Sequence, residues 1–356
     1  MTRRAVWPVL LAVAALAGLV AAGIGALSLT TALSATGLPD PGPATTLGLP
    51  FVRAAGQIAA VTATGGFLFA AFMVPPQDSG VLDVAGYRAL RMARTAALGW
   101  AACALLLVPL TISDISGKPL GDHLNPVDLW RVAGLVGTAN AWRWTAVLAL
   151  VVAIAAAPVL RWSPTPALLA GSLLTLVPLG LTGHASAGGS HDLATNSLLI
   201  HLIAGALWAG GLLALLVHTW RGGEHADIAA RRFGVVALWC FVAMALTGVI
   251  NTLVRIRPAD LLHSGYGFLI VAKAGALAIL AVIGWQQRRS AVRALQADVA
   301  ARSPLVRLAL VEALVFGATF GIAVGLGRTA PPAPRSLNPS AAEVALGYDL
   351  PGPPTG

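Results

Sequence analysis

The stretch TGHASAGGSHDLATNSLLIHLIAGALWAGG, residues 182–211, combines a histidine-containing polar segment with an apolar run. A Gly/Ser-rich loop carries His184 and His191. An apolar run near 194–217 follows, and it is long enough to cross a bilayer as a helix of about 20 residues. His201 lies inside that run. A polar imidazole in a lipid-embedded helix is costly unless it is paired or liganded, so we expect function to be centred here.

The composition places the whole chain in a lipid bilayer. Of its 356 residues, 57% are hydrophobic and only 10% are charged, with a mean hydropathy of +0.80. A soluble globular protein carries about a quarter charged residues, so we predict a polytopic membrane protein. The net charge of +9 is explained by the basic cytoplasmic loops of such proteins, and we expect no nucleic-acid partner. Four methionines without an MxxM or MxxxM pair argue against a thioether metal path.

Apolar runs of spanning length recur along the chain, which predicts an all-α bundle of about nine transmembrane helices. A polar stretch between the third and fourth runs, residues 114–143, is expected to hold a short interfacial helix. Trp130, Trp142 and Trp144 are expected at the membrane boundary. The nine runs lie near 6–33, 50–74, 93–111, 142–160, 165–182, 194–217, 233–253, 265–286 and 305–326.

The distribution of Lys and Arg predicts the orientation. We interpret the first run as a retained span, because a signal-peptide core is about 7–15 residues and this run is longer. One side of the resulting topology then holds 14 basic residues and the other holds eight, which predicts a cytoplasmic N-terminus and an outer C-terminus in the bacterial plasma membrane. Residues 331–356 are rich in Pro and Ala, and we expect a linker or tail there on the outer face.

The predicted topology gathers histidines on the outer side. His123, His184, His191 and His263 fall in outer loops or at outer helix ends, above the embedded His201. Neutral imidazole binds copper and zinc, so His184, His191 and His201 are the main candidate metal ligands, with His123 and His263 as additional ones. Two alternatives stay open: that the loop histidines are ordinary surface residues, and that His201 is an axial haem ligand.

Polar residues inside the last spans form a second set of candidates. Lys273 and Glu312 lie in the eighth and ninth runs, where buried charges normally pair or line a path. We expect either a buried Lys273–Glu312 pair that joins the two helices or a place on a transport path. Asn251, at the outer end of the seventh span, would donate to a ligand or be satisfied within its own helix end.

Three segments resemble the CopD copper-resistance membrane family. They are TGHAS (182–186), IHLIAGALWAGGL (200–212) and GYGFLIVAKAGALAIL (265–280) with WQQRR after it. The resemblance is strongest over 182–332 and implies a CopD-like domain over 1–330. It maps the family's histidines onto His184 and His201 and its lysine onto Lys273. The tail resembles the junction to a CtaG-type cytochrome c oxidase assembly domain in actinobacterial fusions, and this chain stops at that junction, as a truncated fusion or a stand-alone protein.

The resemblance implies copper handling and not catalysis: copper taken up at the outer face, delivered by a periplasmic carrier, and moved across the cytoplasmic membrane in copper homeostasis or resistance. No GxxxxGK[ST] or DKTG motif occurs, so a gradient or a delivered ligand would have to drive transport. Two other functions stay open. One is a haem-bearing b-type redox protein, and the other is a partner that presents copper to oxidase assembly factors.

Overall fold

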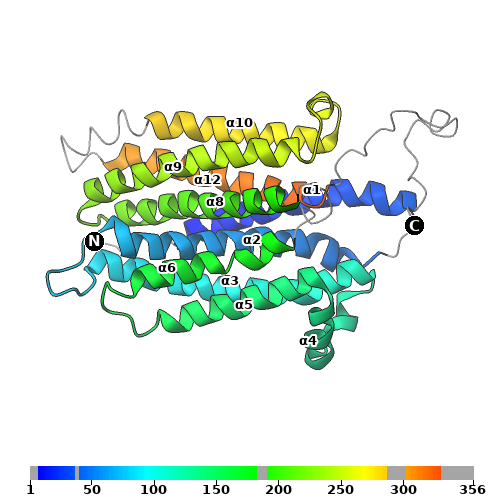
Figure 1. The fold of residues 1–356 in the computed structure, drawn as a ribbon, viewed down its shortest axis with the longest axis horizontal. Coiled ribbons are helices and arrows are strands. Elements are labelled where there is room, and N and C mark those ends of the chain that lie inside the picture. The colour runs from blue at the N-terminus through cyan, green and yellow to red at the C-terminus, as the bar shows by residue number, and fades with distance from the viewer. Residues whose placement is uncertain (1–6, 37–39, 183–190, 287–301, 330–356) are drawn as a thin grey trace.

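The computed structural model describes residues 7–36, 40–182, 191–286 and 302–329, and in these segments the chain is helical throughout, apart from connections and an isolated bridge between Val81 and Arg161. The all-α prediction is therefore confirmed (Figure 1). The helices are α1 (Trp7–Thr36), α2 (Pro43–Leu68) continued by the π-helical turn η1 (Phe69–Met73), α3 (Val84–Ser116), η2 (Leu120–His123), α4 (Pro126–Leu135), α5 (Gly137–Ala155), α6 (Thr165–Leu174), α7 (Val177–Leu181), α8 (His191–Trp220), α9 (Ala226–Leu253), η4 (Pro258–Asp260), α10 (Gly265–Gln286) and α12 (Arg302–Leu326).

One of the nine predicted runs differs from the other eight. Eight helices among the described residues are long and apolar enough to cross a membrane, whereas the predicted fifth run, 165–182, corresponds to a shorter apolar segment, Thr165–Leu181. It is also interrupted between α6 and α7, where Pro178 cannot donate a backbone hydrogen bond. This segment therefore does not meet the length of a regular span, although it lies within the bundle beside α2 and α5.

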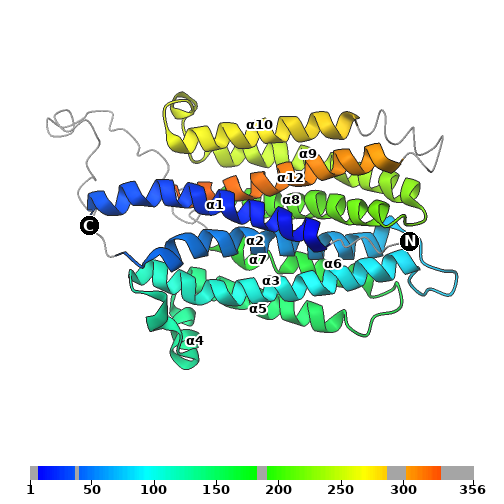
Figure 2. The ribbon, with the colours of Figure 1, turned by 180° about the vertical axis from the view of Figure 1, so that it is seen from behind.

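The relative direction of α1 and α12 shows that α6 and α7 still complete a pass. Gly317 of α12 packs on Val13 of α1, and further along Gly325 packs on Ile24, so the two helices run side by side in the same direction (Figure 2). A parallel pair requires an odd number of passes from the first helix to the last. The eight long helices alone would leave α1 and α12 antiparallel.

The connections gather at two ends of the bundle. At one end, which we call the basic end, lie the connections 74–83, 156–164 and 221–225, near Arg88 and Arg221. At the other, which we call the α4 end, lie the segment 117–136 with α4 and the connection 254–264 (Figure 1). This is the same grouping of connections that the sequence predicted.

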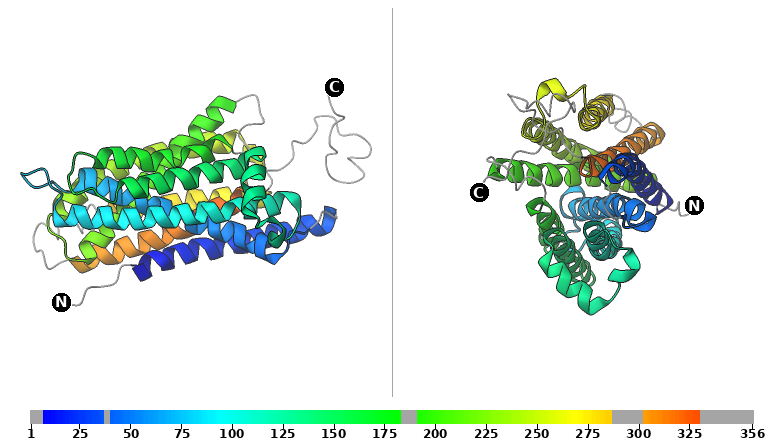
Figure 3. Two further views of the ribbon diagram at one scale, coloured as in Figure 1. Left: turned by 90° about the horizontal axis from the view of Figure 1, so that it is seen from below. Right: turned by 90° about the vertical axis from the view of Figure 1, so that its right-hand side faces the viewer.

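The helices α2 and α8 form the interior of the bundle (Figure 3). They cross at Gly65 and Gly210, where a Cβ atom on either glycine would collide with the backbone of the other helix. Gly66 packs in the same way on Ala93 of α3, and Gly211 packs on Phe233 of α9. Both glycine pairs thus allow close helix packing, because small residues let the backbones approach where lipid gives no hydrophobic driving force.

The α4 end contains the predicted short helix. Asn125 caps α4 by accepting a hydrogen bond from the Val127 amide at 3.1 Å, and Pro126 begins it. Trp130 and Trp144 are exposed, as expected for residues at a membrane boundary. Trp142 is not: it is 2% exposed and packs edge-on against Trp100, so its assignment to the boundary was wrong. Its position on α5 faces α3 and the core.

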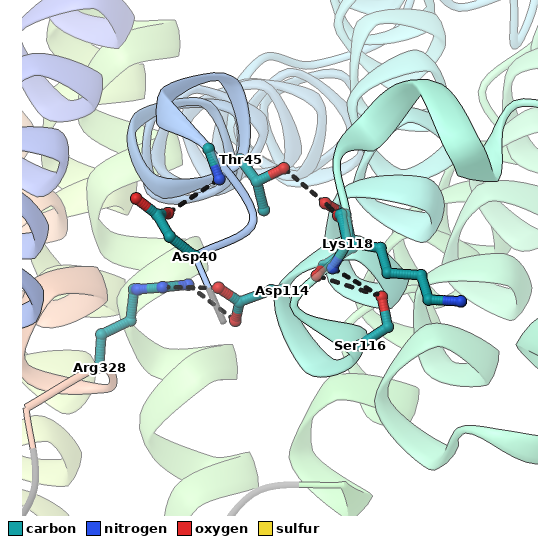
Figure 4. Close-up of polar contacts among 8 residues, drawn as sticks. Asp40, Thr45, Asp114, Ser116, Lys118 and Arg328 are labelled. Carbon is teal, nitrogen blue, oxygen red and sulfur yellow. Dashed lines mark hydrogen bonds and ion pairs between the residues drawn. The ribbon is translucent and has the colours of Figure 1, made fainter. Parts of the chain in front are cut away.

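A bidentate ion pair ties α12 to α3 at this end. Arg328 donates to both carboxylate oxygens of Asp114, at 2.9 and 3.3 Å, and its side chain is largely buried (Figure 4). Beside it, Thr45 at the start of α2 hydrogen-bonds Ser113 at 2.7 Å. These contacts join the ends of α2, α3 and α12. The two N–H donors of the guanidinium fix the orientation of Arg328 on the Asp114 carboxylate.

Candidate functional site

His201 lies ten residues into α8, about 15 Å along the helix from its start at the α4 end. Its Nδ1 atom lies 2.9 Å from the hydroxyl oxygen of Thr247 on α9. That hydroxyl donates its single proton to the Ala243 carbonyl at 2.6 Å. Nδ1 must therefore be the donor to Thr247, which fixes the neutral imidazole as the Nδ1–H tautomer and leaves the lone pair on Nε2.

This arrangement is typical of a metal-binding imidazole. A ligating histidine almost always donates its second ring N–H to a fixed acceptor, which sets the ring orientation. Here α9 supplies that acceptor, and Ser197 on α8 donates to the Thr247 carbonyl at 3.3 Å, so the two helices are joined on both sides of the ring. Gly248 on α9 lies against the ring edge at Cε1 and leaves it room.

Asn251 lies one turn beyond Thr247 on α9, toward the α4 end, and so on the same helix face. Its Oδ1 atom is buried and has no hydrogen-bond partner within the described residues. The expectation of an amide satisfied within its own helix end therefore does not hold for this oxygen. An orphaned buried acceptor is costly, and in a native structure it calls for a ligand, water or ion.

Two cations lie close enough to His201 to act on it electrostatically: Lys273 on α10 and Arg255 in the connection after α9. From the α4 end, Lys273 is about 12 Å into α10, whereas Glu312 is about 21 Å from the end of α12. A direct Lys273–Glu312 pair stays a prediction.

The outer histidines are placed apart where the structure describes them. His184 lies outside the described residues, and His191 begins α8, with no side-chain position described. His123 is half-buried beside α4 and hydrogen-bonds Ser116 at 2.9 Å, on the far side of the bundle from α9. His263 is exposed and hydrogen-bonds the Ala259 carbonyl at 3.0 Å. No group of three His, Cys, Asp or Glu able to hold a metal occurs within the described segments.

His218 gives a useful contrast at the basic end of the same helix. Its Nε2 atom donates to the Glu224 carbonyl at 2.8 Å, and its ring lies 4.9 Å from that of Phe69. A Cβ on Gly223 would overlap the ring. This imidazole is thus enclosed by its neighbours. Among the described histidines, none lies on a facing helix at the level of His201, as a bis-histidine haem site would require.

The sequence singled out His201 but missed its partner, Thr247. A signal existed: Met244, Thr247 and Asn251 recur at three- and four-residue spacing on one face of α9. Threonine in an apolar helix usually bonds its own backbone, so this spacing carries no meaning until a neighbouring helix is placed against it.

Comparison with known families covers most of the helical region. Residues 43–195 match the family described as copper resistance protein D-like, N-terminal domain, and residues 228–326 match copper resistance protein D. Both matches are to regions described for copper resistance protein D. The first match covers α2 to the start of α8, and the second covers most of α9 together with α10 and α12. Thr247, Asn251 and Lys273 lie within the second match. Neither match concerns a CtaG-type domain.

Curated relatives agree with this family. The chain is 26% identical over 204 residues to the copper transport protein CutJ of Bacillus subtilis, covering 53% of this chain and 37% of that protein. It is 26% identical over 189 residues to an uncharacterized protein of Mycobacterium leprae, covering 53% and 29%. It is also 26% identical to the inner membrane protein YebZ of Escherichia coli, covering 59% and 74%. The alignments thus span about a third of the first two relatives. No solved structure matches significantly. These CopD matches support a copper-related bacterial membrane protein.

Proposed function

We propose that this CopD-like protein takes copper from the outer face, at the α4 end, and moves it across the cytoplasmic membrane. The observation that carries the proposal is the His201–Thr247 hydrogen bond, which leaves Nε2 as the one ring atom able to bind a metal. The orphaned oxygen of Asn251 lies on the same side, between His201 and the α4 end. Neutral imidazole is a good copper ligand, and copper is the metal named for both matched families.

His184 and His191 complete the proposed site as ligands that would collect copper above His201. His191 begins α8, and the sequence between it and His184 contains Gly188 and Gly189, residues that would let the chain bend around an ion. The positive-inside rule supports an outer α4 end, because the opposite end carries the richer set of Lys and Arg.

The matched test compares two histidines of one helix. His201→Ala should lower copper bound by purified protein, and copper uptake into proteoliposomes, by on the order of tenfold or more. His218→Ala should leave both near wild type, because that imidazole is enclosed at the basic end. Equal losses for the two variants, or no loss for His201→Ala, would overturn the proposal.

A copper-presenting role is the second candidate, and one observation favours it. Below His201, Trp208 packs edge-on against Phe241 at 5.8 Å and Phe316 at 5.1 Å, which places an aromatic cluster between His201 and the basic end. Copper held above this cluster would be open to a partner at the outer face, such as an oxidase assembly factor. Copper uptake into vesicles separates the two roles. A transporter moves copper into the vesicle, whereas a copper-presenting protein binds copper without moving it across the membrane. An optical spectrum of the purified protein would show a Soret band only if the haem alternative holds.

A further inference from the structure

The interface of α8 and α9 contains two side chains that insert reciprocally over glycines. His201 of α8 lies over Gly248 of α9, with Cε1 3.9 Å from the position of a Cβ there. One turn deeper, Met244 of α9 lies over Gly205 of α8, with Sδ 3.6 Å from the corresponding position. The two pairs follow the register of antiparallel helices, so the imidazole and the thioether occupy successive levels of one seam.

The groups along this seam change in chemical type with depth. From the α4 end inward they are the orphaned amide oxygen of Asn251, the imidazole of His201 and the thioether of Met244. Thr247 connects the last two, because its hydroxyl accepts from His201 and also lies 3.4 Å from the Met244 carbonyl. A thioether is a poor ligand for hard cations but a good one for Cu(I).

We propose that Nε2 of His201 and Sδ of Met244 are consecutive ligands for a monovalent, soft cation, Cu(I). This rests on the proposed function for the identity of the metal and adds its oxidation state. The glycines opposite both side chains give the imidazole and the thioether room at the interface. The two ligands lie on different helices, so no pair of methionines within one helix marks this site.

The charges around the seam favour the same ion. Lys273 and Arg255 act on His201, and the energy of bringing a cation near them scales with its charge. A monovalent ion therefore meets half the repulsion of Cu(II) or Zn(II) at the same position. Below Met244, the rings of Trp208, Phe241 and Phe316 pack edge-on against one another, so the surroundings there are apolar. An ion that sheds its hydration shell onto nitrogen and sulfur ligands suits such a position.

The test uses Met244→Leu, which keeps the volume and removes the sulfur, with Met92→Leu as matched control. Met92 is a buried methionine on α3 that lines a small pocket together with His218, away from the seam. In purified full-length protein, Cu(I) and Ag(I) affinities are measured by competition with a chromogenic chelator. Met244→Leu should weaken both on the order of tenfold or more, whereas Met92→Leu should match wild type, and Zn(II) binding should not change for either.

A second measurement does not depend on the variant folding. Protein labelled with selenomethionine and loaded with Cu(I) should show a copper neighbour at the selenium absorption edge. Absence of that neighbour, or Cu(I) affinity equal in Met244→Leu and Met92→Leu, overturns the inference. The two proposals fail separately. If His201→Ala loses copper uptake but Met244→Leu binds Cu(I) normally, only the proposed His201–Met244 Cu(I) site is wrong. If His201→Ala takes up copper normally, the proposed function itself is wrong.

Discussion

Nδ1 of His201 and the hydroxyl oxygen of Thr247 lie 2.9 Å apart across the α8–α9 interface. The relationship is directional, because the threonine proton is already donated to the Ala243 carbonyl. The imidazole must donate, and its second nitrogen is left as the acceptor. A hydroxyl placed one helix away therefore determines which ring atom of His201 can bind a metal, and makes Thr247 a positioning residue.

Replacing Thr247 with Val should lower copper affinity by about 10- to 100-fold, the usual loss when the partner of a ligating histidine is removed. Valine keeps the shape but offers no acceptor, so the ring loses its preferred tautomer and orientation. Thr247→Ser should retain near wild-type affinity. The measurement is copper competition with a chelator in detergent, together with the histidine ring ¹⁵N shifts, which report the tautomer directly.

Thr252→Val is the matched control for that experiment. Thr252 lies on the same helix and makes the same backbone bond, to the Gly248 carbonyl at 2.8 Å, without a histidine partner. Its replacement should leave copper affinity unchanged. A comparable loss in Thr252→Val would mean that the effect arises from the stability of α9 and not from the position of His201.

The sequence predicted the helices well, because hydrophobic runs of spanning length are enforced by the bilayer itself. The runs near 50–74 and 265–286 correspond closely to α2 with η1 and to α10. The interruption between α6 and α7 was missed, although Pro178 lies there. Trp142 was misplaced for a related reason: tryptophan suits both a membrane boundary and a core, and only its contact with Trp100 distinguishes them.

The candidate site was predicted less completely, because its contacts join residues far apart in the chain. His201 and Thr247 are 46 residues apart, and no spacing rule connects them. Lys273 and Glu312 were expected to pair because their runs place them at roughly similar depths, but run boundaries do not show whether two side chains on neighbouring helices meet. Composition fixes what lies in the membrane, whereas register between helices depends on side-chain packing.

The crossing of α2 and α8 should be intolerant of any side chain. A Cβ on Gly210 would overlap the Val61 carbonyl and crowd the Gly65 backbone, and neither can move as a side-chain end can. Gly210→Ala should therefore destabilise the protein by about 1–3 kcal/mol or more, measured as a lower thermal midpoint by fluorescence-detected size exclusion. Gly275→Ala on α10 is the control. Nothing lies within 4 Å of its Cβ position, so it should be neutral or slightly stabilising.

The orientation prediction can be tested with two exposed positions at opposite ends. In a background with Cys103 and Cys240 replaced by Ala, Gly121→Cys marks the α4 end and Ser79→Cys marks the basic end. A membrane-impermeant thiol reagent added to intact spheroplasts should label Gly121→Cys and not Ser79→Cys, because the end richer in Lys and Arg is expected to face the cytoplasm. The reverse pattern would invert the topology and place His201 near the cytoplasmic face.

The last prediction concerns Lys273 and Glu312, which lie at different distances from the α4 ends of their helices. Lys273→Met and Glu312→Gln should then change folding free energy independently, so that the double variant equals the sum of the single changes within about 0.5 kcal/mol. Their effects on copper should also differ. Removing the Lys273 charge, which acts on His201, should strengthen Cu(I) binding, because a cation is no longer repelled. Glu312→Gln should leave the His201 affinity unchanged. A double variant clearly more stable than that sum would show that the two residues interact.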